Sequence, residues 1–229
     1  MSKGCIIKPI VLLLVSVGIN TPSVQAQDQA FPVASVRSLK VDIAGGHLKI
    51  RTLEGTESAK VIYDPQTLSS GCRFYAKIDG SELIVYYKPR SLVPNRFCKA
   101  DFEIVVPPEV SISVSHEHGT TSISGNYKKM DLNLVFSLFK LNSVAPRVVA
   151  NTVSTESVFR FGSSAVDTVF ELSAVGGSNR LELPSASKVK LRHQSMMSKV
   201  ENEFGSESAA TFQVEAKLMS SFLRIVKTK

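Results

Sequence analysis

The chain has 229 residues, a formal net charge of +7 and no tryptophan. Its basic residues are dispersed, without the long basic run of a nucleic-acid-binding arm, so we expect no nucleic-acid partner. Helical periodicity is nowhere sustained, whereas short runs of alternating apolar and polar residues recur along most of the chain. This pattern argues against an all-α protein and predicts an all-β fold.

Residues 1–26 have the features of a secretory signal peptide. Lys3 and Lys8 precede an apolar run from Ile10 to Ile19, and Val24-Gln25-Ala26 supplies a small-residue cleavage site. The apolar run is about half the roughly 20 residues that a membrane-spanning helix needs. We therefore expect an exported protein, periplasmic or at the cell surface, that is not transmembrane after signal removal. Cleavage would remove two lysines and no acidic residue, which lowers the formal charge from +7 to +5.

Residues 27–109 are predicted to form an N-terminal β region that contains a hairpin and a disulfide. Cys72 and Cys98 are the two cysteines outside the signal peptide. An even number of cysteines in an exported protein predicts a disulfide between them. Between them, Asp79-Gly80-Ser81 separates two runs rich in aromatic and β-branched residues, which is typical of a β-hairpin.

Residues 110–229 contain short alternating runs at intervals of roughly 20 residues, a spacing that suggests a repeat architecture. Aligning the runs places apolar residues in two inward columns, because strand side chains alternate between faces. Intervening residues such as Asn133 and Gln213 would face water. The first column holds Ile112, Leu132, Val148, Phe170, Val189 and Phe212, and the second holds Val114, Leu134, Ala150, Leu172, Leu191 and Val214. The pattern predicts a single-stranded β-solenoid of stacked coils of about 20 residues, with an N-terminal β-hairpin and cap region.

The segment His116-Glu117-His118 is the one place where two histidines lie close together in the sequence. His116 falls in a third inward column, together with Phe136 and His193. His118 lies two residues further on, yet no third ligand is apparent, and a lone His-x-His is a weak metal motif. We predict a structural role for both histidines and no metal site.

Three segments resemble the bacterial putative-adhesin β-solenoid family of unknown function. DFEIVVPPEVSISVSHEHGTTSISG (101–125) is similar to that family's junction between a strand ending in Val-Pro and the first glycine-containing coil. VDIAGGHLKIRT (41–52) and FYAKIDGSELIVYYK (74–88) are similar to its opening strands. The resemblance extends from Leu39 to Lys227 and implies an exported β-solenoid. The corners HEHG, FSLF and HQSMMS depart from the more Gly- and Asp-rich turns of the family.

The sequence contains no nucleophile elbow, zinc-binding helix motif or phosphate-binding glycine loop. We therefore predict a protein that is not an enzyme, with no catalytic residue and no cofactor. The weaker alternative is a polysaccharide-active enzyme, which would need convergent carboxylates. The carboxylates available for it are Glu156, Glu171, Glu182, Glu201 and Glu203.

Two groups of basic residues are candidates for contact with an anionic ligand. One group flanks the cysteine-linked loop and the other alternates along a single strand: Lys88, Arg90, Arg96 and Lys99, and Lys188, Lys190 and Arg192. Exposed charge of this kind also protects strand edges from association. We predict an interaction or adhesin-like scaffold whose partner is a cell-envelope component, either protein, glycan or anionic lipid. The alternative is a periplasmic carrier that binds lipid or glycan.

Overall fold

The computed structural model describes residues 27–65, 71–90, 98–162, 167–207 and 210–228, so the predicted signal peptide lies outside the described residues. The protein is all-β, as predicted, with one short 3-10 helix, η1 (Val33–Ser35). The first six strands are β1 (Gln27–Pro32), β2 (Ser38–Thr52), β3 (Ser58–Pro65), β4 (Cys72–Asp79), β5 (Glu82–Pro89) and β6 (Ala100–Val106). The remaining strands are β7 (Val110–Val135), β8 (Ser137–Val144), β9 (Arg147–Phe161), β10 (Thr168–Pro184), β11 (Val189–Met196), β12 (Lys199–Asn202), β13 (Phe212–Met219) and β14 (Phe222–Thr228).

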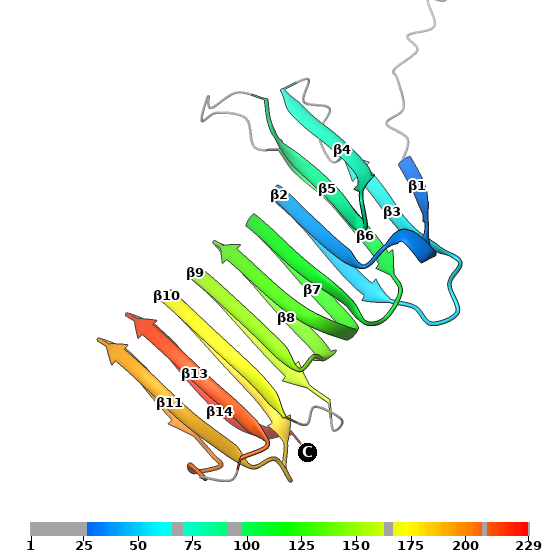
Figure 1. Ribbon diagram of the computed structural model, residues 1–229. Helices are drawn as coiled ribbons and strands as arrows, with labels where there is room; N and C mark the ends of the chain where they lie inside the picture. Colours follow the sequence, from blue (N-terminus) through cyan, green and yellow to red (C-terminus); the bar gives the residue numbers. More distant parts are fainter. Residues whose placement is uncertain (1–26, 66–70, 91–97, 163–166, 208–209, 229) are drawn as a thin grey trace, which may run out of the picture.

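All of these strands belong to one mixed sheet of 14 strands, which corrects the prediction of a single-stranded β-solenoid with an N-terminal β-hairpin and cap region. Strand β2 pairs with β5, β6 and β7, so the N-terminal strands continue the same hydrogen-bonded sheet. Three strand pairs, β1–β3, β3–β6 and β4–β5, are antiparallel. The strands are also not uniform units, since β7 has 26 residues and β12 has four. Figure 1 shows the strands stacked from β1 and β4 at one end to β11 at the other.

The chain does not enter this stack in sequence order at its C-terminal end. Strand β13 pairs with β10 on one side and with β11 on the other, so the last part of the chain lies between two earlier strands. Strand β14 in the same way lies between β10 and β12. A repeat in the sequence predicts that each strand pairs with the next strand along the chain. The repeat analysis therefore did not predict this insertion.

The predicted columns have the correct faces but the wrong register at two places. Leu132 pairs with Ala150, not with Val148, and Phe170 pairs with Val214, not with Phe212. Both errors are shifts of two residues. A shift of two leaves every side chain on its face, because side chains in a strand alternate with a period of two. The inward columns are therefore buried, apart from the half-buried Leu191, although their partners differ from the alignment.

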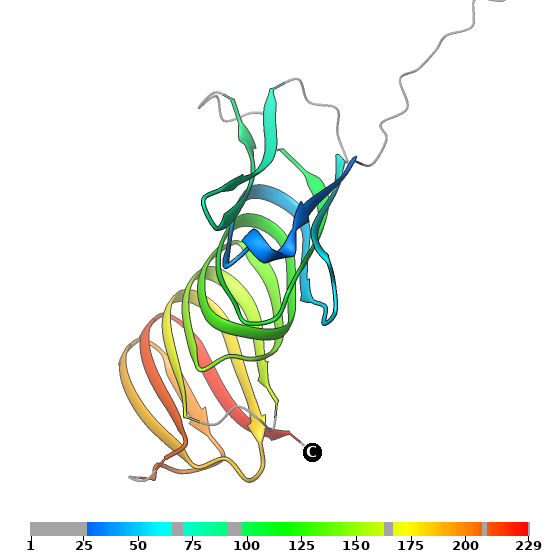
Figure 2. The ribbon, with the colours of Figure 1, turned by 45° about the vertical axis from the view of Figure 1, so that its right-hand side comes forward.

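The long strands bend around a common apolar interior (Figure 2). Much of this interior consists of phenylalanine rings in a continuous series of contacts, with centroid distances of 5.2 Å for Phe139–Phe159, 4.8 Å for Phe159–Phe170 and 5.0 Å for Phe161–Phe212. Each of these rings is at most 1% exposed. Rings at such distances bury large apolar areas and add favourable edge contacts. The interior is thus a packed core in this part of the chain.

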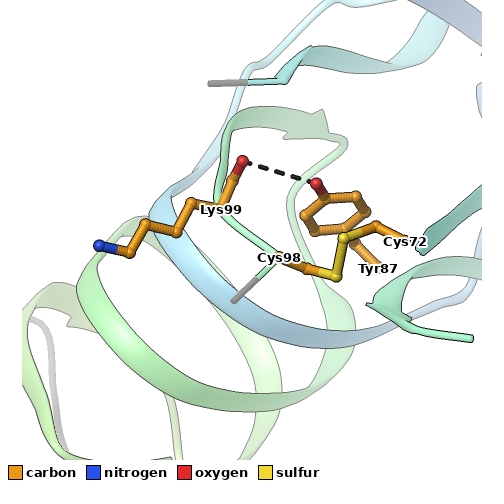
Figure 3. Close-up of a disulfide and its surroundings, with 4 residues drawn as sticks. All are labelled: Cys72, Tyr87, Cys98 and Lys99. Carbon is orange, nitrogen blue, oxygen red and sulfur yellow. Dashed lines mark hydrogen bonds between the residues drawn. A yellow bond between two sulfur atoms is a disulfide. The ribbon is translucent and has the colours of Figure 1, made fainter. Parts of the chain in front are cut away.

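The predicted hairpin and disulfide are confirmed at the N-terminal end of the sheet. Strands β4 and β5 pair antiparallel around Gly80 and Ser81, and Cys72 is bonded to Cys98 with their Cα atoms 5.8 Å apart. Figure 3 shows Tyr87 beside this bond, with its hydroxyl donating to the Lys99 carbonyl oxygen at 3.5 Å. The disulfide thus ties the hairpin to the start of β6. Among the residues that the structure describes, no helix is long and apolar enough to cross a membrane.

Candidate functional site

Five residues with positive φ align at one corner of the sheet, where the long strands bend. We call them the corner row: Phe136 (47°), Ser154 (49°), Gly176 (67°), Met197 (51°) and Ser220 (49°). The strand register brings these residues together. The residue that precedes each of the last four is paired with its neighbour on the adjacent strand, in the order Val153, Val175, Met219 and Met196 across β9, β10, β13 and β11. The left-handed conformation costs non-glycine residues on the order of 1 kcal/mol each. Only one of the five is the glycine that this conformation favours.

Small residues follow each corner position, and the hydroxyls of Thr155, Ser198 and Ser221 bond backbone groups inside the bend. The small residues are Ser137, Thr155, Gly177, Ser198 and Ser221. The Thr155 hydroxyl donates to the Leu134 carbonyl at 3.2 Å, and the Ser221 hydroxyl donates to the Gly176 carbonyl at 2.8 Å. A bend that interrupts the strand ladder leaves backbone groups that need such partners. Side-chain hydrogen bonds between neighbouring strands therefore help to hold the corner.

Large apolar side chains project into solvent along the same corner. We call them the apolar stripe: Phe136, Val153, Val175, Met196, Met197 and Met219, which are between 38% and 80% exposed. Val153, Val175, Met219 and Met196 are direct neighbours across adjacent strands. Four steps between neighbouring strands make the stripe roughly 19 Å long. Leu138, which is 52% exposed, adjoins it, and Leu53 is the remaining exposed large apolar residue in the described chain.

A shallow hollow of about 540 Å³ runs beside the apolar stripe on the outer face of the sheet. Val153, Val175, Met196 and Met219 form its apolar side. Its polar side is formed by outward-facing residues of the same strands, Asn151, Ser173, Gln194 and Lys217. The hollow thus offers an apolar row and a parallel row of hydrogen-bonding groups. This arrangement can hold a partner that is apolar on one side and polar on the other.

Phe136 and His193 are not in the inward column where the sequence places them. Phe136 is 58% exposed, because its own positive φ breaks the alternation of faces. His193 is exposed because β11 ends the strand path and its inward side is not covered. The sequence does carry a signal for the stripe, since an apolar residue, the corner residue and a small residue recur as Val-Phe-Ser, Val-Ser-Thr, Val-Gly-Gly, Met-Met-Ser and Met-Ser-Ser.

The two neighbouring histidines lie in different environments. His116 is fully buried, and its Nδ1 is 2.6 Å from the Thr121 hydroxyl. Burial, together with the nearby His118, lowers the pKa of His116 to about 4, so the ring is neutral at pH 7. His118 is exposed and stacks on Phe136 with a centroid distance of 5.6 Å. His118 thus extends the apolar stripe, while His116 belongs to the core.

The first basic group is only partly available to a ligand. The ammonium of Lys88 lies 2.8 Å from Asp42 and 2.9 Å from Glu117. Burial alone would lower the pKa of Lys88, but hydrogen bonds to both carboxylates outweigh it and raise that pKa. Arg90 is exposed at the end of β5, and the exposed Lys99 side chain extends away from the disulfide (Figure 3). Arg96 lies outside the described residues.

The second basic group lies at the other end of the sheet, so the structure does not bring the two groups together. Lys188 and Arg192 are exposed and Lys190 is half-buried on or next to β11. A guanidinium nitrogen of Arg192 lies 3.9 Å from Glu215. Four of the five candidate carboxylates form ion pairs with arginine or lysine, namely Glu171, Glu182, Glu201 and Glu203.

Comparison with known proteins shows similarity at the level of the fold. No protein-family model and no curated protein sequence matches the chain. A putative cell adhesion protein from Clostridium sporogenes is similar in structure, with a TM-score of 0.52 and 9% sequence identity, over 89% of this chain and 99% of that protein. A putative adhesin from Bacteroides fragilis has a TM-score of 0.40 and 10% identity, over 90% of this chain and 99% of that protein. A putative lipid binding protein from Parabacteroides distasonis has a TM-score of 0.26 and 7% identity, over 88% and 96% of the two chains.

Proposed function

We propose that this protein is an exported, non-enzymatic binding protein of the cell envelope, and that it holds a protein partner against the apolar stripe. The observation that carries the proposal is the alignment of four exposed apolar side chains across adjacent strands, with the exposed Phe136 and Met197 at the corner beside them. Contiguous apolar surface of this kind marks sites of interaction in soluble proteins. The disulfide and the predicted signal peptide support export. The fold shared with a putative cell adhesion protein supports an adhesin-like role.

The choice of residues at the corner also supports a binding role. Glycine would relieve the positive φ at Phe136 and Met197 and would remove their exposed apolar surface. Both positions instead keep large apolar side chains, at a cost in backbone strain and in solvation. Strained positions that also expose apolar groups are typical of functional sites. Apart from the stacking of Phe136 on His118, the contacts within the fold give no reason for these two residues.

A protein fits the stripe better than a sugar does. The stripe consists of valine, methionine and one phenylalanine, whereas sugar rings are usually held by several aromatic faces. Methionine is common at surfaces that bind proteins, because its flexible thioether adapts to the shape of a partner. The parallel row of Asn151, Ser173 and Gln194 can then bond polar groups of that partner.

The test compares two substitutions that place the same charge at equally exposed valine and leucine side chains. Val175 is 44% exposed and lies in the stripe, whereas Leu53 is 46% exposed and lies away from it. In Val175→Asp a partner would bury an unpaired carboxylate, which costs several kcal/mol. We expect the binding of labelled mature protein to envelope fractions to weaken about 100-fold or more.

The control variant Leu53→Asp should bind like the wild type. Protease treatment of the envelope fractions should abolish binding, because the proposed partner is a protein. Equal binding by both variants would reject the stripe as the contact surface. Binding that survives protease treatment, or that is reproduced by lipid vesicles, would reject a protein partner.

A further inference from the structure

A second surface, on the part of the sheet beyond the corner, gathers cations that the function proposed above does not use. Arg160 on β9 lies directly across from Glu182 on β10, and Arg180 precedes Glu182 by two residues on the same face. We call these three side chains the arginine cluster. None of them is among the basic residues expected from the sequence to contact an anion. The register of β9 on β10 is what brings them together.

Glu182 holds both guanidinium groups in fixed positions. The Arg160 Nε donates to one carboxylate oxygen of Glu182 at 2.7 Å, and the Arg180 Nε donates to the other oxygen at 2.7 Å. The Glu182 side chain is only 10% exposed, whereas those of Arg160 and Arg180 are 55% and 47% exposed. Burial would raise the pKa of Glu182, but the hydrogen bonds from both arginines outweigh it and lower that pKa. The carboxylate is therefore ionised and acts as a fixed support for two exposed cations.

The arginine cluster separates two shallow hollows of about 590 and 760 Å³ on the outer face. Asn142, Arg160, Arg180 and Glu182 line both of them. Lys140 adds a cation to the first hollow, and Lys227 adds one to the second. Taken together, the linings carry four cations and one carboxylate. Since a guanidinium has five N–H donors, both arginines keep donors beyond those given to Glu182.

We propose that this surface binds an acidic glycan, whose carboxylate or sulfate groups are held by Arg160 and Arg180. A guanidinium binds such planar or oxygen-rich anions through two parallel hydrogen bonds, and an arginine already fixed by a neighbour loses less freedom on binding. The two hollows together reach across the sheet from Ser122 on β7 to Lys227 on β14, so an extended polymer fits the surface better than a single ion. Asn142, Ser122 and Ser185 in the linings supply groups for sugar hydroxyls.

The test uses the mature protein, polygalacturonate and dextran sulfate as acidic polymers, and neutral dextran as the uncharged control. The variant R160Q/R180Q/E182Q removes the whole arginine cluster and lowers the net charge by one. The control R147Q also lowers the net charge by one and also removes an ion pair between β9 and β10, since Arg147 lies 2.8 Å from Glu171 on a different part of the sheet. Replacing all three residues by glutamine leaves no unpaired buried carboxylate.

The wild type should bind the acidic polymers, more weakly at high salt, and should not bind neutral dextran. The triple variant should lose about tenfold or more in affinity, because charge-assisted hydrogen bonds to two arginines are removed. R147Q should stay within about twofold of the wild type. Equal losses in R147Q and the triple variant would overturn the proposal, since net charge alone would then explain binding. Binding to phosphatidylglycerol vesicles without binding to either acidic polymer would also overturn it, in favour of a lipid surface.

Discussion

The buried imidazole of His116 makes the stability of the fold depend on pH between about 6.5 and 4. His116 is fully buried, and its Nε2 has no hydrogen-bond partner among the described residues. A proton added to the ring would therefore introduce a buried charge without an acceptor. The perturbation that tests this is His116→Asn, which keeps a polar group near Thr121 but cannot titrate. His193→Asn removes an exposed imidazole and serves as the control.

The magnitude follows from the pKa of His116, which is about 4 in the folded protein against 6.5 for an unperturbed histidine. Between these two pH values the unfolded chain binds the proton and the folded chain does not. The free energy of unfolding therefore rises with pH through this window. The contribution of His116 to it is lost as the pH falls from 6.5 towards 4. At about 1.4 kcal/mol per pH unit, the whole window corresponds to about 3 kcal/mol.

The assay is urea unfolding of the mature wild type and both variants at several pH values between about 7.5 and 4. This range covers the interval between the unfolded and folded pKa values of His116. Ionised carboxylates with lowered pKa, such as Glu103 and Glu182, also lose stabilisation on acidification, but all three proteins share that loss. The difference between wild type and His116→Asn isolates the histidine. We expect the variant to lose about 3 kcal/mol less than the wild type over this range. The same slope in wild type and His116→Asn would show that His116 does not cause this pH dependence, and His193→Asn should follow the wild type.

Three further predictions concern the core, the disulfide and the glycines. Leu172→Asp, at a side chain that is 1% exposed, should cost several kcal/mol in urea unfolding, whereas Gln213→Asp on the outer face should be mild; equal damage would show that the faces are assigned wrongly. Cys72→Ser/Cys98→Ser should lower the free energy of unfolding by on the order of 3 kcal/mol, and non-reduced peptide mapping should show the two cysteines joined in the wild type; free thiols in exported protein would contradict this. Gly119→Ala should destabilise strongly, because φ is +128° and the new Cβ would collide with the Gly46 carbonyl. Gly55→Ala is the control, since a Cβ at Gly55 (φ +67°) meets no atom within 4 Å. Thermal midpoints that fall equally in the two variants would reject the close approach of β2 and β7.

The faces of the strands could be predicted from the sequence, and their partners could not. Alternation assigns Leu134 and Leu172 to the core and Gln213 to the outside correctly, because burial depends only on face. Alignments that differ by two residues are indistinguishable by this criterion, so Leu132 and Phe170 received the wrong neighbours. The insertion of β13 between β10 and β11 joins segments that are not consecutive, and the sequence gives no sign of it. The disulfide was predictable because cysteine number and a hairpin turn are local features.

The candidate sites were harder to predict, because each depends on a backbone conformation or a strand register that the sequence pattern does not reveal. The apolar stripe requires a left-handed residue at every corner, whereas regular alternation of faces placed Phe136 in an inward column. The arginine cluster requires the register that places Arg160 across from Glu182. Lys88, by contrast, was identified as a candidate contact for an anion, but Asp42 and Glu117 already neutralise it in the folded chain.

Phe136→Gly provides the most direct test of the account, because it separates the binding role of the apolar stripe from its part in the fold. Glycine adopts the positive φ of this position without strain, which offsets the loss of the contact with His118. We therefore expect a thermal midpoint equal to or above that of the wild type, together with a loss of binding to envelope fractions of about tenfold or more. Unchanged binding by a folded Phe136→Gly protein would contradict the claim that the apolar stripe is the contact surface.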